Sequence, residues 1–176
     1  HLLAALQRRR DALDGLRTLA RLRYRSPDGT ENARNVLAVE RPDRIRFEVL
    51  SVLGSLLVLA SEDGSFAAYV PRESTLYRGA ASPENLAPYL PIDVSVEQIV
   101  DLLLATPPLF DGRPTAVDRE DGLVRLTQRD GDALRIACFS ATAMPVRYRE
   151  IDRHGRTTID ARYGDVDASG AVPLAR

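Results

Sequence analysis

Side chains that could carry out catalysis or bind a metal are few in this sequence and lie far apart. The two histidines are His1, at the start of the chain, and His154, in a predicted turn. Neither has a second ligand at the spacing that zinc sites use. The single cysteine, Cys138, alternates with Leu134 and Ile136 on the predicted apolar face of a strand and has no flanking base. We therefore expect a buried structural cysteine rather than a nucleophile.

Acidic residues cluster at turns instead of at ligand spacing. Glu62-Asp63, Glu120-Asp121 and the pair Asp130 and Asp132 each fall in a predicted turn, where Asp is favoured because it hydrogen-bonds to the local backbone. A calcium site needs several oxygens at loop spacing, which these groups lack. The sequence also has no phosphate-binding glycine loop and no nucleophile elbow. We predict no catalytic residues, no metal site and no cofactor, and hence a protein that is not an enzyme.

Arginine supplies all of the 24 basic residues, and the net charge of −1 argues against a general nucleic-acid binder. Five arginines on predicted strands or turns could form a basic stripe: Arg44, Arg46, Arg147, Arg149 and Arg153. Two interpretations stay open for this stripe. It is either the solvated face of a sheet or a contact for anionic lipid headgroups.

A predicted hairpin tip at residues 50–55 has an unusual composition. Hairpin tips are normally polar because they face water, yet this one contains Val52 and Leu53. The tip either folds back and is buried, or it is a hydrophobic finger that contacts a membrane or a partner. Burial of one Leu contributes roughly 1.5–3 kcal/mol, which suits transient contact rather than anchoring.

The elements that must position these residues follow from the hydrophobic pattern. Helical spacing of Leu2, Leu6 and Leu13 predicts a helix over residues 2–14. Period-two alternation and Asp-Gly turns predict strands over residues 17–78 and again over 113–164. Two apolar helices are expected between them over 82–106, capped by Ser82 and by Ser95, and the first should reach about Leu90.

The predicted fold class is mainly β (α+β), with about 10–11 antiparallel strands, an N-terminal helix and a helical insertion. A chain of 176 residues with 44% hydrophobic residues is expected to form one domain, spanning 1–176. No apolar stretch is long enough for a membrane-spanning helix. Since chains do not begin with His, we expect a missing upstream segment, and residues 172–176 read like the start of a strand that is cut off.

Four stretches of the sequence resemble the LolA/LolB-like lipoprotein carriers, and most closely the LolB-type outer-membrane receptor. They are Arg41 to Val49, Val52-Leu53-Gly54-Ser55 with the following strand, Asn85 to Ile92 leading into Ser95 to Val100, and the Pro107-Pro108 break. The order of helix, strands, helical insertion and strands is also similar. The resemblance covers about residues 2–165.

This resemblance implies an open antiparallel half-barrel with the helices as a lid and with acyl chains in the concavity. In LolB-like proteins the Leu of a Leu-Gly tip protrudes and helps deliver cargo, and here that position is Leu53. Val52 stands where family members often have Pro. The family's receptor is anchored through a lipidated N-terminal Cys, which this chain lacks, so anchoring is an expectation about the upstream segment.

With the charged faces directed outward, the resemblance assigns lipid contact to the inward-facing residues. From the strands these are Leu22, Tyr24, Leu37, Val39, Ile45, Phe47, Val49, Leu126, Ile136 and Tyr148. From the lid they are Leu86, Leu90, Ile99, Leu102 and Leu103. The membrane-contacting tip is assigned to Val52 and Leu53.

The leading hypothesis is a lipid- or lipoprotein-binding carrier or receptor of the bacterial cell envelope, which holds acyl chains in an apolar concavity. It would lie in the periplasm, anchored to the outer membrane, and would deliver its cargo there. The expected partners are acyl chains, the inner leaflet of that membrane and a periplasmic carrier protein, with no nucleic acid. The alternative is a non-catalytic envelope scaffold or sensor that reuses the fold for protein–protein interaction.

Overall fold

The computed structural model describes residues 2–26, 29–90, 94–109 and 114–164. The side chains of Leu22 and of residues 24–26 and 29–31 fall outside this description. The chain forms two compact units, one of residues 14–100 and one of residues 1–13 with 101–176. Each contains one open antiparallel sheet, and the described residues form eleven strands. The mainly β fold class with few helices is thereby confirmed, whereas the single domain over 1–176 stays a prediction.

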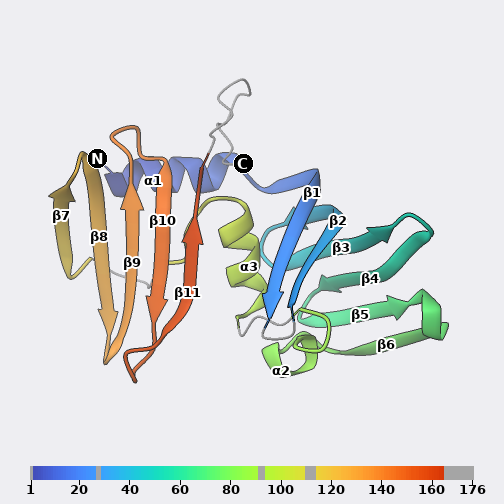
Figure 1. The fold of residues 1–176 in the computed structure, drawn as a ribbon. Coiled ribbons are helices and arrows are strands. Elements are labelled where there is room, and N and C mark those ends of the chain that lie inside the picture. The colour runs from blue at the N-terminus through green and yellow to red at the C-terminus, as the bar shows by residue number, and fades with distance from the viewer. Residues whose placement is uncertain (1, 27–28, 91–93, 110–113, 165–176) are drawn as a thin grey trace. The chain divides into compact units, whose positions relative to one another are not determined.

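The unit of residues 14–100 contains a six-stranded sheet in simple sequential order, which Figure 1 shows from blue to green. Few residues separate neighbouring strands in the chain, and every pairing is antiparallel. A 3-10 turn, η1 (Pro71–Glu73), connects the last two strands. The strands are β1 (Gly15–Ser26), β2 (Gly29–Glu40), β3 (Arg44–Ser51), β4 (Gly54–Glu62), β5 (Ser65–Val70) and β6 (Thr75–Ala80).

The second unit pairs a five-stranded sheet with the N-terminal helix α1 (Leu2–Ala12). Its core contains Leu126, Ala137, Phe139 and Tyr148, against which Leu2 and Leu6 of α1 pack. The predicted helix over 2–14 therefore exists but ends two residues early, and the chain passes directly into β1, with Arg41 N donating to the Asp14 carbonyl (2.8 Å). The strands are β7 (Ala116–Glu120), β8 (Leu123–Asp130), β9 (Ala133–Phe139), β10 (Pro145–Ile151) and β11 (Thr157–Arg162).

Two of the Asp-Gly pairs form the tight hairpins that the sequence predicts. Asp63 and Gly64 join β4 to β5, and Asp121 and Gly122 join β7 to β8. All four residues have positive φ, as a type I′ turn requires. These turns set the register of the neighbouring strands, and hence which side chains share a face.

The helical insertion is shorter than predicted. The first helix, α2 (Pro83–Leu86), begins at the Ser82 cap as expected but does not reach Leu90. The reason is Pro88, which has no N–H to continue the helical hydrogen bonds.

The second helix, α3 (Val96–Leu103), has the predicted capping box. Ser95 N donates to Gln98 Oε1 (3.0 Å), and Gln98 N donates to Ser95 Oγ (3.3 Å). The helix ends before residue 106 because Ala105 adopts a left-handed conformation and Thr106 N donates back to the Asp101 carbonyl (2.9 Å).

Candidate functional site: an apolar sheet face and an exposed hairpin tip

One face of the β1–β6 sheet is apolar, and we call it the apolar face. Register places Leu37, Phe47, Leu59 and Ala68 in one row across β2 to β5, each at most 9% exposed. The neighbouring row contains Val39, Ile45, Ser61 and Phe66, which are also buried. The sheet therefore brings together four residues that the sequence assigns to lipid contact, namely Leu37, Val39, Ile45 and Phe47.

Leu59, Phe66 and Ala68 also lie on this face, although they were not among the predicted lining residues. Their alternation within two predicted strands was visible, but the side they occupy depends on the register of the β4–β5 hairpin. The side chains of the assigned residues Leu22 and Tyr24 lie outside the described part of the structure. For the other residues, lipid contact stays a prediction.

Burial along the apolar face decreases toward the β3–β4 hairpin tip. Val39 and Ile45 are 3% and 5% exposed, whereas Val49 and its register partner Leu57 are only half-buried. Asn35 lies opposite Val49, is 1% exposed and donates from Nδ2 to the Ala33 carbonyl (3.1 Å). Its Oδ1 is buried and has no hydrogen-bond partner among the described residues. The tip end of this face thus offers partly accessible apolar surface and one unused acceptor.

The segment around α2 covers part of the apolar face at β5 and β6. The Tyr89 ring lies 5.9 Å from that of Phe66 and 5.8 Å from that of Tyr77, measured between ring centroids. Asn85 Nδ2 donates to the Ala80 carbonyl (3.0 Å), which fixes the segment to the edge of β6. Leu86, which follows Asn85 in the chain, is buried and only 2% exposed.

The residues assigned to the lid do not behave as one group. Leu86 and Ile99 are buried and belong to the unit of residues 14–100, where Leu90 is half-buried. Leu102 belongs to the other unit and packs against the core of the five-stranded sheet. Leu103 is 40% exposed.

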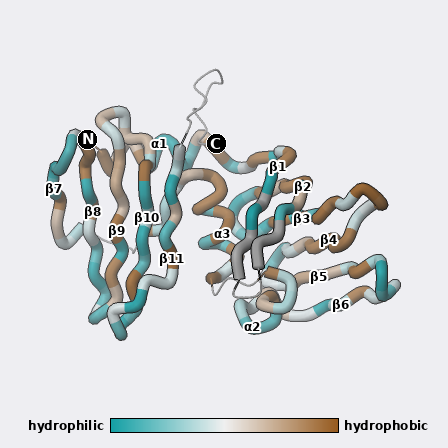
Figure 2. Tube along the Cα trace, in the orientation of Figure 1, coloured by the Kyte–Doolittle hydropathy of each residue, from teal (hydrophilic) through white to brown (hydrophobic). Residues whose placement is uncertain are grey.

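The β3–β4 hairpin tip is exposed, so of the two alternatives left open by the sequence, the one in which the tip folds back and is buried is wrong. Val52 and Leu53 are 101% and 97% exposed, and Figure 2 colours the end of the β3–β4 hairpin as hydrophobic. Ser51 Oγ accepts from Leu53 N (3.1 Å) and donates to the Gly54 carbonyl (2.9 Å). Gly54 has φ of 122°, which favours glycine. The backbone of the tip is thus held by local bonds while both apolar side chains face water.

The core of the five-stranded sheet contains Leu126 and Tyr148, two further predicted lining residues, at 2% and 0% exposure. The Tyr148 hydroxyl donates to Glu150 Oε2 (2.8 Å), which also accepts from Arg135 Nε (3.2 Å). Burial, together with the Glu150 carboxylate, raises the pKa of Tyr148 far above its usual value. This sheet face is therefore well packed, and its buried polar groups form a network.

Ile136 does not share the face of Leu126 and Tyr148, in contrast to the prediction. Both of those residues lie opposite Ala137 in the register, and Ile136 is its direct neighbour along β9. Side chains alternate along a strand, so Ile136 points to the other side of the sheet. The alternation of Leu134, Ile136 and Cys138 was correctly read, but Ala137 and Phe139 occupy the buried side.

Cys138 and His154 have the following surroundings. Cys138 is half-buried and lies between Arg125 and Arg147 in the register, so the expectation of a buried core cysteine is wrong. His154 is exposed in a turn, as predicted, and its backbone N donates to Asp152 Oδ1 (2.8 Å). His1 lies outside the described residues, among which we find no group of acidic, Cys or His side chains that could hold a metal ion.

The predicted arginine stripe is divided between two sheets. Arg44 and Arg46 lie on β3, whereas Arg147 and Arg149 lie on β10 and Arg153 lies in the following turn. Arg44 pairs with Glu40 (3.2 Å) and Glu62 (2.6 Å). Arg147 makes two bonds to Asp160 (2.8 and 2.6 Å), which lower the pKa of that carboxyl.

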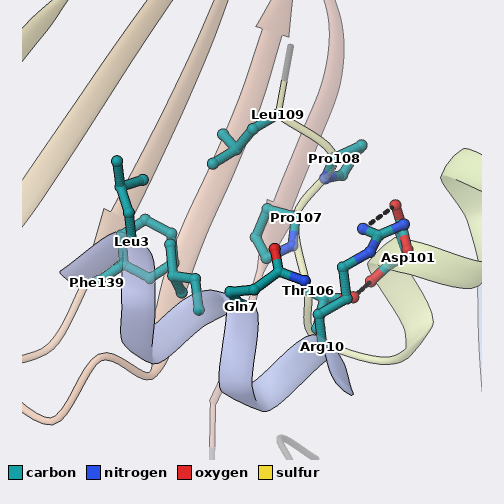
Figure 3. Close-up of a pocket in the computed structure, with 10 residues that line it drawn as sticks. Leu3, Gln7, Arg10, Asp101, Thr106, Pro107, Pro108, Leu109 and Phe139 are labelled. Atoms are coloured by element: carbon teal, nitrogen blue, oxygen red, sulfur yellow. Dashed lines mark hydrogen bonds and ion pairs between the residues drawn. The ribbon is translucent and has the colours of Figure 1, made fainter. Parts of the chain in front are cut away.

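A pocket of about 490 Å³ lies beside α1 in the second unit (Figure 3). Its lining mixes apolar side chains of α1, Phe139 and the segment after α3 with an ion pair between Arg10 and Asp101 (2.9 Å). Arg9, one residue earlier, is 9% exposed and donates to the Ala105 carbonyl (3.3 Å). These polar contacts fix α1 to the last turn of α3 and to the segment after it. No helix in the described part of the chain is long and apolar enough to cross a membrane.

Comparison with known proteins identifies the fold. No protein-family model and no curated protein matches the sequence. Among solved structures, one similar chain is a domain assigned as an outer membrane lipoprotein-sorting protein from Vibrio parahaemolyticus, with a TM-score of 0.60, 11% identity, and coverage of 99% of this chain and 81% of that one. Another is a LolA superfamily protein from Nitrosomonas europaea, with a TM-score of 0.58, 13% identity, and coverage of 99% and 89%. At the level of the fold, these neighbours confirm the resemblance seen in the sequence.

Proposed function

We propose, from the premise that this chain has the fold of LolA-superfamily lipoprotein-sorting proteins, that it is a non-catalytic lipid- or lipoprotein-binding domain of the bacterial cell envelope. In this proposal the apolar face of β1–β6 holds acyl chains, and the β3–β4 hairpin tip delivers them to a membrane. The domain would work in the periplasm, with the inner leaflet of the outer membrane as its destination and a periplasmic carrier protein as its donor.

The observation that carries the proposal is the exposed tip. Two adjacent apolar side chains, Val52 and Leu53, are almost fully exposed on a hairpin whose turn is fixed by Ser51. They contribute nothing to the core, and exposed apolar surface of this kind marks an interaction site. Burying one Leu in a bilayer contributes roughly 1.5–3 kcal/mol, which permits repeated contact and release.

The apolar face supports the cargo part of the proposal. Each acyl CH₂ removed from water contributes about 0.8 kcal/mol, so a long chain needs a continuous apolar surface. Half-buried Val49 and Leu57 mark the accessible end of this face, which is also the end nearest the tip. The Asn35 Oδ1 beside them would accept a hydrogen bond from an amide N–H or hydroxyl of the cargo.

A matched pair of variants tests acyl-chain binding. Val49→Glu places a carboxylate on the apolar face, and Val58→Glu places one on the opposite face of the neighbouring strand; both valines are half-buried. We expect the wild type to bind a fluorescent long-chain fatty acid and Val49→Glu to bind it at least about tenfold more weakly, because a carboxylate in an apolar site is costly. Val58→Glu should bind normally. Absence of wild-type binding, or equal losses in both variants, would refute the proposal.

A scaffold or sensor is the second candidate, and the filled core of the five-stranded sheet favours it. Phe139 and Tyr148 are both 0% exposed, so the core of this unit is packed solid by its own side chains. In that case Leu53→Glu would abolish pull-down of a protein partner and leave fatty-acid binding unchanged.

A further inference from the structure

The face of the β1–β6 sheet opposite to the apolar face carries a row of apolar side chains that are exposed or half-buried. The register places this row across the sheet as Leu19, Val36, Val58, Tyr69 and Leu76, with Glu48 between Val36 and Val58. Leu19 is 78% exposed, Leu76 49% and Tyr69 41%. The water-facing side of an antiparallel sheet is normally polar. This row therefore marks a surface that contacts something other than water.

Arginines stand directly beside the apolar row, on the side nearer the hairpin tip. Arg21 and Arg34 are register partners, so two like charges face each other on one side of the sheet. Such a pair destabilises a sheet unless an anion lies between the two charges. Both side chains are exposed, and no described residue forms an ion pair or side-chain hydrogen bond with either. Next along this row is Leu50, which leads to the tip.

A groove lies on the other side of the apolar row. In the row that contains Arg17 and Arg46, the small residue Ala38 lies between them and the small residue Ala60 follows Arg46. These alanines and arginines line a groove of about 460 Å³, which we call the arginine groove. Arg44 at its end is neutralised by Glu40 and Glu62, whereas Arg17 has no such partner among the described residues. Positive charge therefore flanks the apolar row on both sides.

We propose that this face docks flat onto an anionic lipid bilayer, with arginine side chains on headgroup phosphates and the apolar row at the headgroup level. Arginine binds phosphate through two parallel hydrogen bonds, which suits the Arg21–Arg34 pair and the arginine groove. Partly exposed Leu and Tyr residues suit the interface between headgroups and acyl chains. The surface is continuous with the exposed tip through Leu50, so both would meet the same membrane.

This inference does not depend on acyl-chain binding by the apolar face, and it extends beyond the tip contact. The charge balance favours a bilayer as the occupant. The acidic residues on this face are Glu40, Glu48 and Glu62, and Glu40 and Glu62 are already paired with Arg44. The arginines that remain are available for anions: Arg17, Arg21, Arg34 and Arg78.

Vesicle co-sedimentation of the full chain tests the proposal. We compare vesicles of phosphatidylcholine with vesicles in which part of it is replaced by phosphatidylglycerol. Wild-type protein should bind the anionic vesicles and lose affinity when the salt concentration is raised. The double variant Arg21→Gln/Arg34→Gln should bind roughly 10- to 30-fold more weakly, since each arginine near an anionic surface contributes about 1 kcal/mol. Leu19→Ser should also weaken binding.

The control is a variant that removes the same number of positive charges from the other unit. Arg119→Gln/Arg129→Gln removes two exposed arginines of β7 and β8, neither of which has an ion-pair partner among the described residues. This control should bind like the wild type. Thermal unfolding and the fatty-acid titration, measured on every variant, separate loss of fold and loss of acyl binding from loss of docking.

Several outcomes would overturn the proposal. They are absence of wild-type binding to anionic vesicles, equal binding to phosphatidylcholine vesicles, and equal losses in the test and control variants. Concentration-dependent dimerisation that Leu19→Ser abolishes, without vesicle binding, would assign this face to a second copy of the chain instead. Normal fatty-acid binding in the Arg21→Gln/Arg34→Gln variant with weakened docking would support both proposals separately.

Discussion

At the scale of single residues, a substitution of Leu53 should impair function without affecting stability. It is 97% exposed and makes no core contact, so Leu53→Ser should change the free energy of unfolding by less than about 0.5 kcal/mol. The same variant should transfer a bound fluorescent fatty acid to vesicles about tenfold more slowly, because it loses the burial of one Leu. Val117→Ser, at an exposed position of the other unit, is the control and should transfer normally. Unchanged transfer by Leu53→Ser would exclude the tip from delivery.

Tyr148 is buried and Tyr163 is half-buried in the second unit, and their hydroxyls differ in one hydrogen bond. The Tyr148 hydroxyl donates to Glu150, whereas the Tyr163 hydroxyl is buried without a partner among the described residues. Tyr148→Phe should lower the free energy of unfolding by about 1.5–3 kcal/mol, because it removes a bond to a charged group. Tyr163→Phe should be neutral or stabilising. Urea unfolding at neutral pH measures both, and equal effects would show that the hydroxyls have equivalent surroundings.

The same tyrosines predict a loss of stability in alkali. Burial raises the pKa of Tyr148 and of Tyr163 above the value of 10.0 for an unperturbed tyrosine. Below pH 10 both hydroxyls are protonated in the folded and unfolded chains, so their contribution to the free energy of unfolding does not change with pH. Above it the unfolded chain releases these protons first, and the stability declines as the pH rises. Unfolding free energies at about pH 8 and about pH 11 should differ less in the Tyr148→Phe/Tyr163→Phe variant than in the wild type.

At the scale of elements, Gly54 determines the shape of the β3–β4 hairpin. Its φ of 122° is a conformation that other residues adopt only with strain, although a Cβ there would meet no atom within 4 Å. Gly54→Ala should therefore lower the free energy of unfolding by about 1–3 kcal/mol through the backbone alone. Gly164→Ala is the control, since its surroundings are equally open and its φ is not in the positive range. Equal stability of both variants would show that the turn adapts.

The strands and their turns were predictable from the sequence, because alternation and Asp-Gly pairs are local signals. Which of the two faces of a strand is buried was not predictable from these local signals. Ala137 and Phe139 are buried instead of Ile136 because the core under β9 selects the other side of the strand, which alternation alone does not show. The length of α2 was overestimated because its periodicity continues past Pro88, whereas Pro88 has no N–H and interrupts the helical hydrogen bonds at its own position. Exposure of the Val52–Leu53 tip depends on the parts of the fold that surround it in space. The sequence therefore left open whether the tip is buried or exposed.

At the scale of the whole molecule, the two units differ in how their chain segments are connected. Residues 14–100 form one unit from a continuous segment, whereas the other combines residues 1–13 with 101–176. Deleting residues 1–13 should therefore affect the second unit, which loses the packing of Leu2 and Leu6 on its core, roughly 2–4 kcal/mol.

Amide hydrogen exchange is the measurement for this deletion. Exchange should become faster in β8, β9 and β10 and should stay unchanged in β3, β4 and β5. Uniformly faster exchange in both sheets would contradict the division into units, because it would mean that the chain unfolds as one cooperative body.

The placement of α1 also imposes an order on the biogenesis of the protein. The helix leaves the ribosome before the strands on which it packs, because its partners Leu126, Ala137 and Tyr148 follow more than a hundred residues later. At about 5–20 residues per second, the helix waits for several seconds with Leu2 and Leu6 unprotected. The unit of residues 14–100 is complete by then and can fold first. The nascent chain thus carries α1 with the side chains of Leu2 and Leu6 unpacked until β8, β9 and β10 emerge.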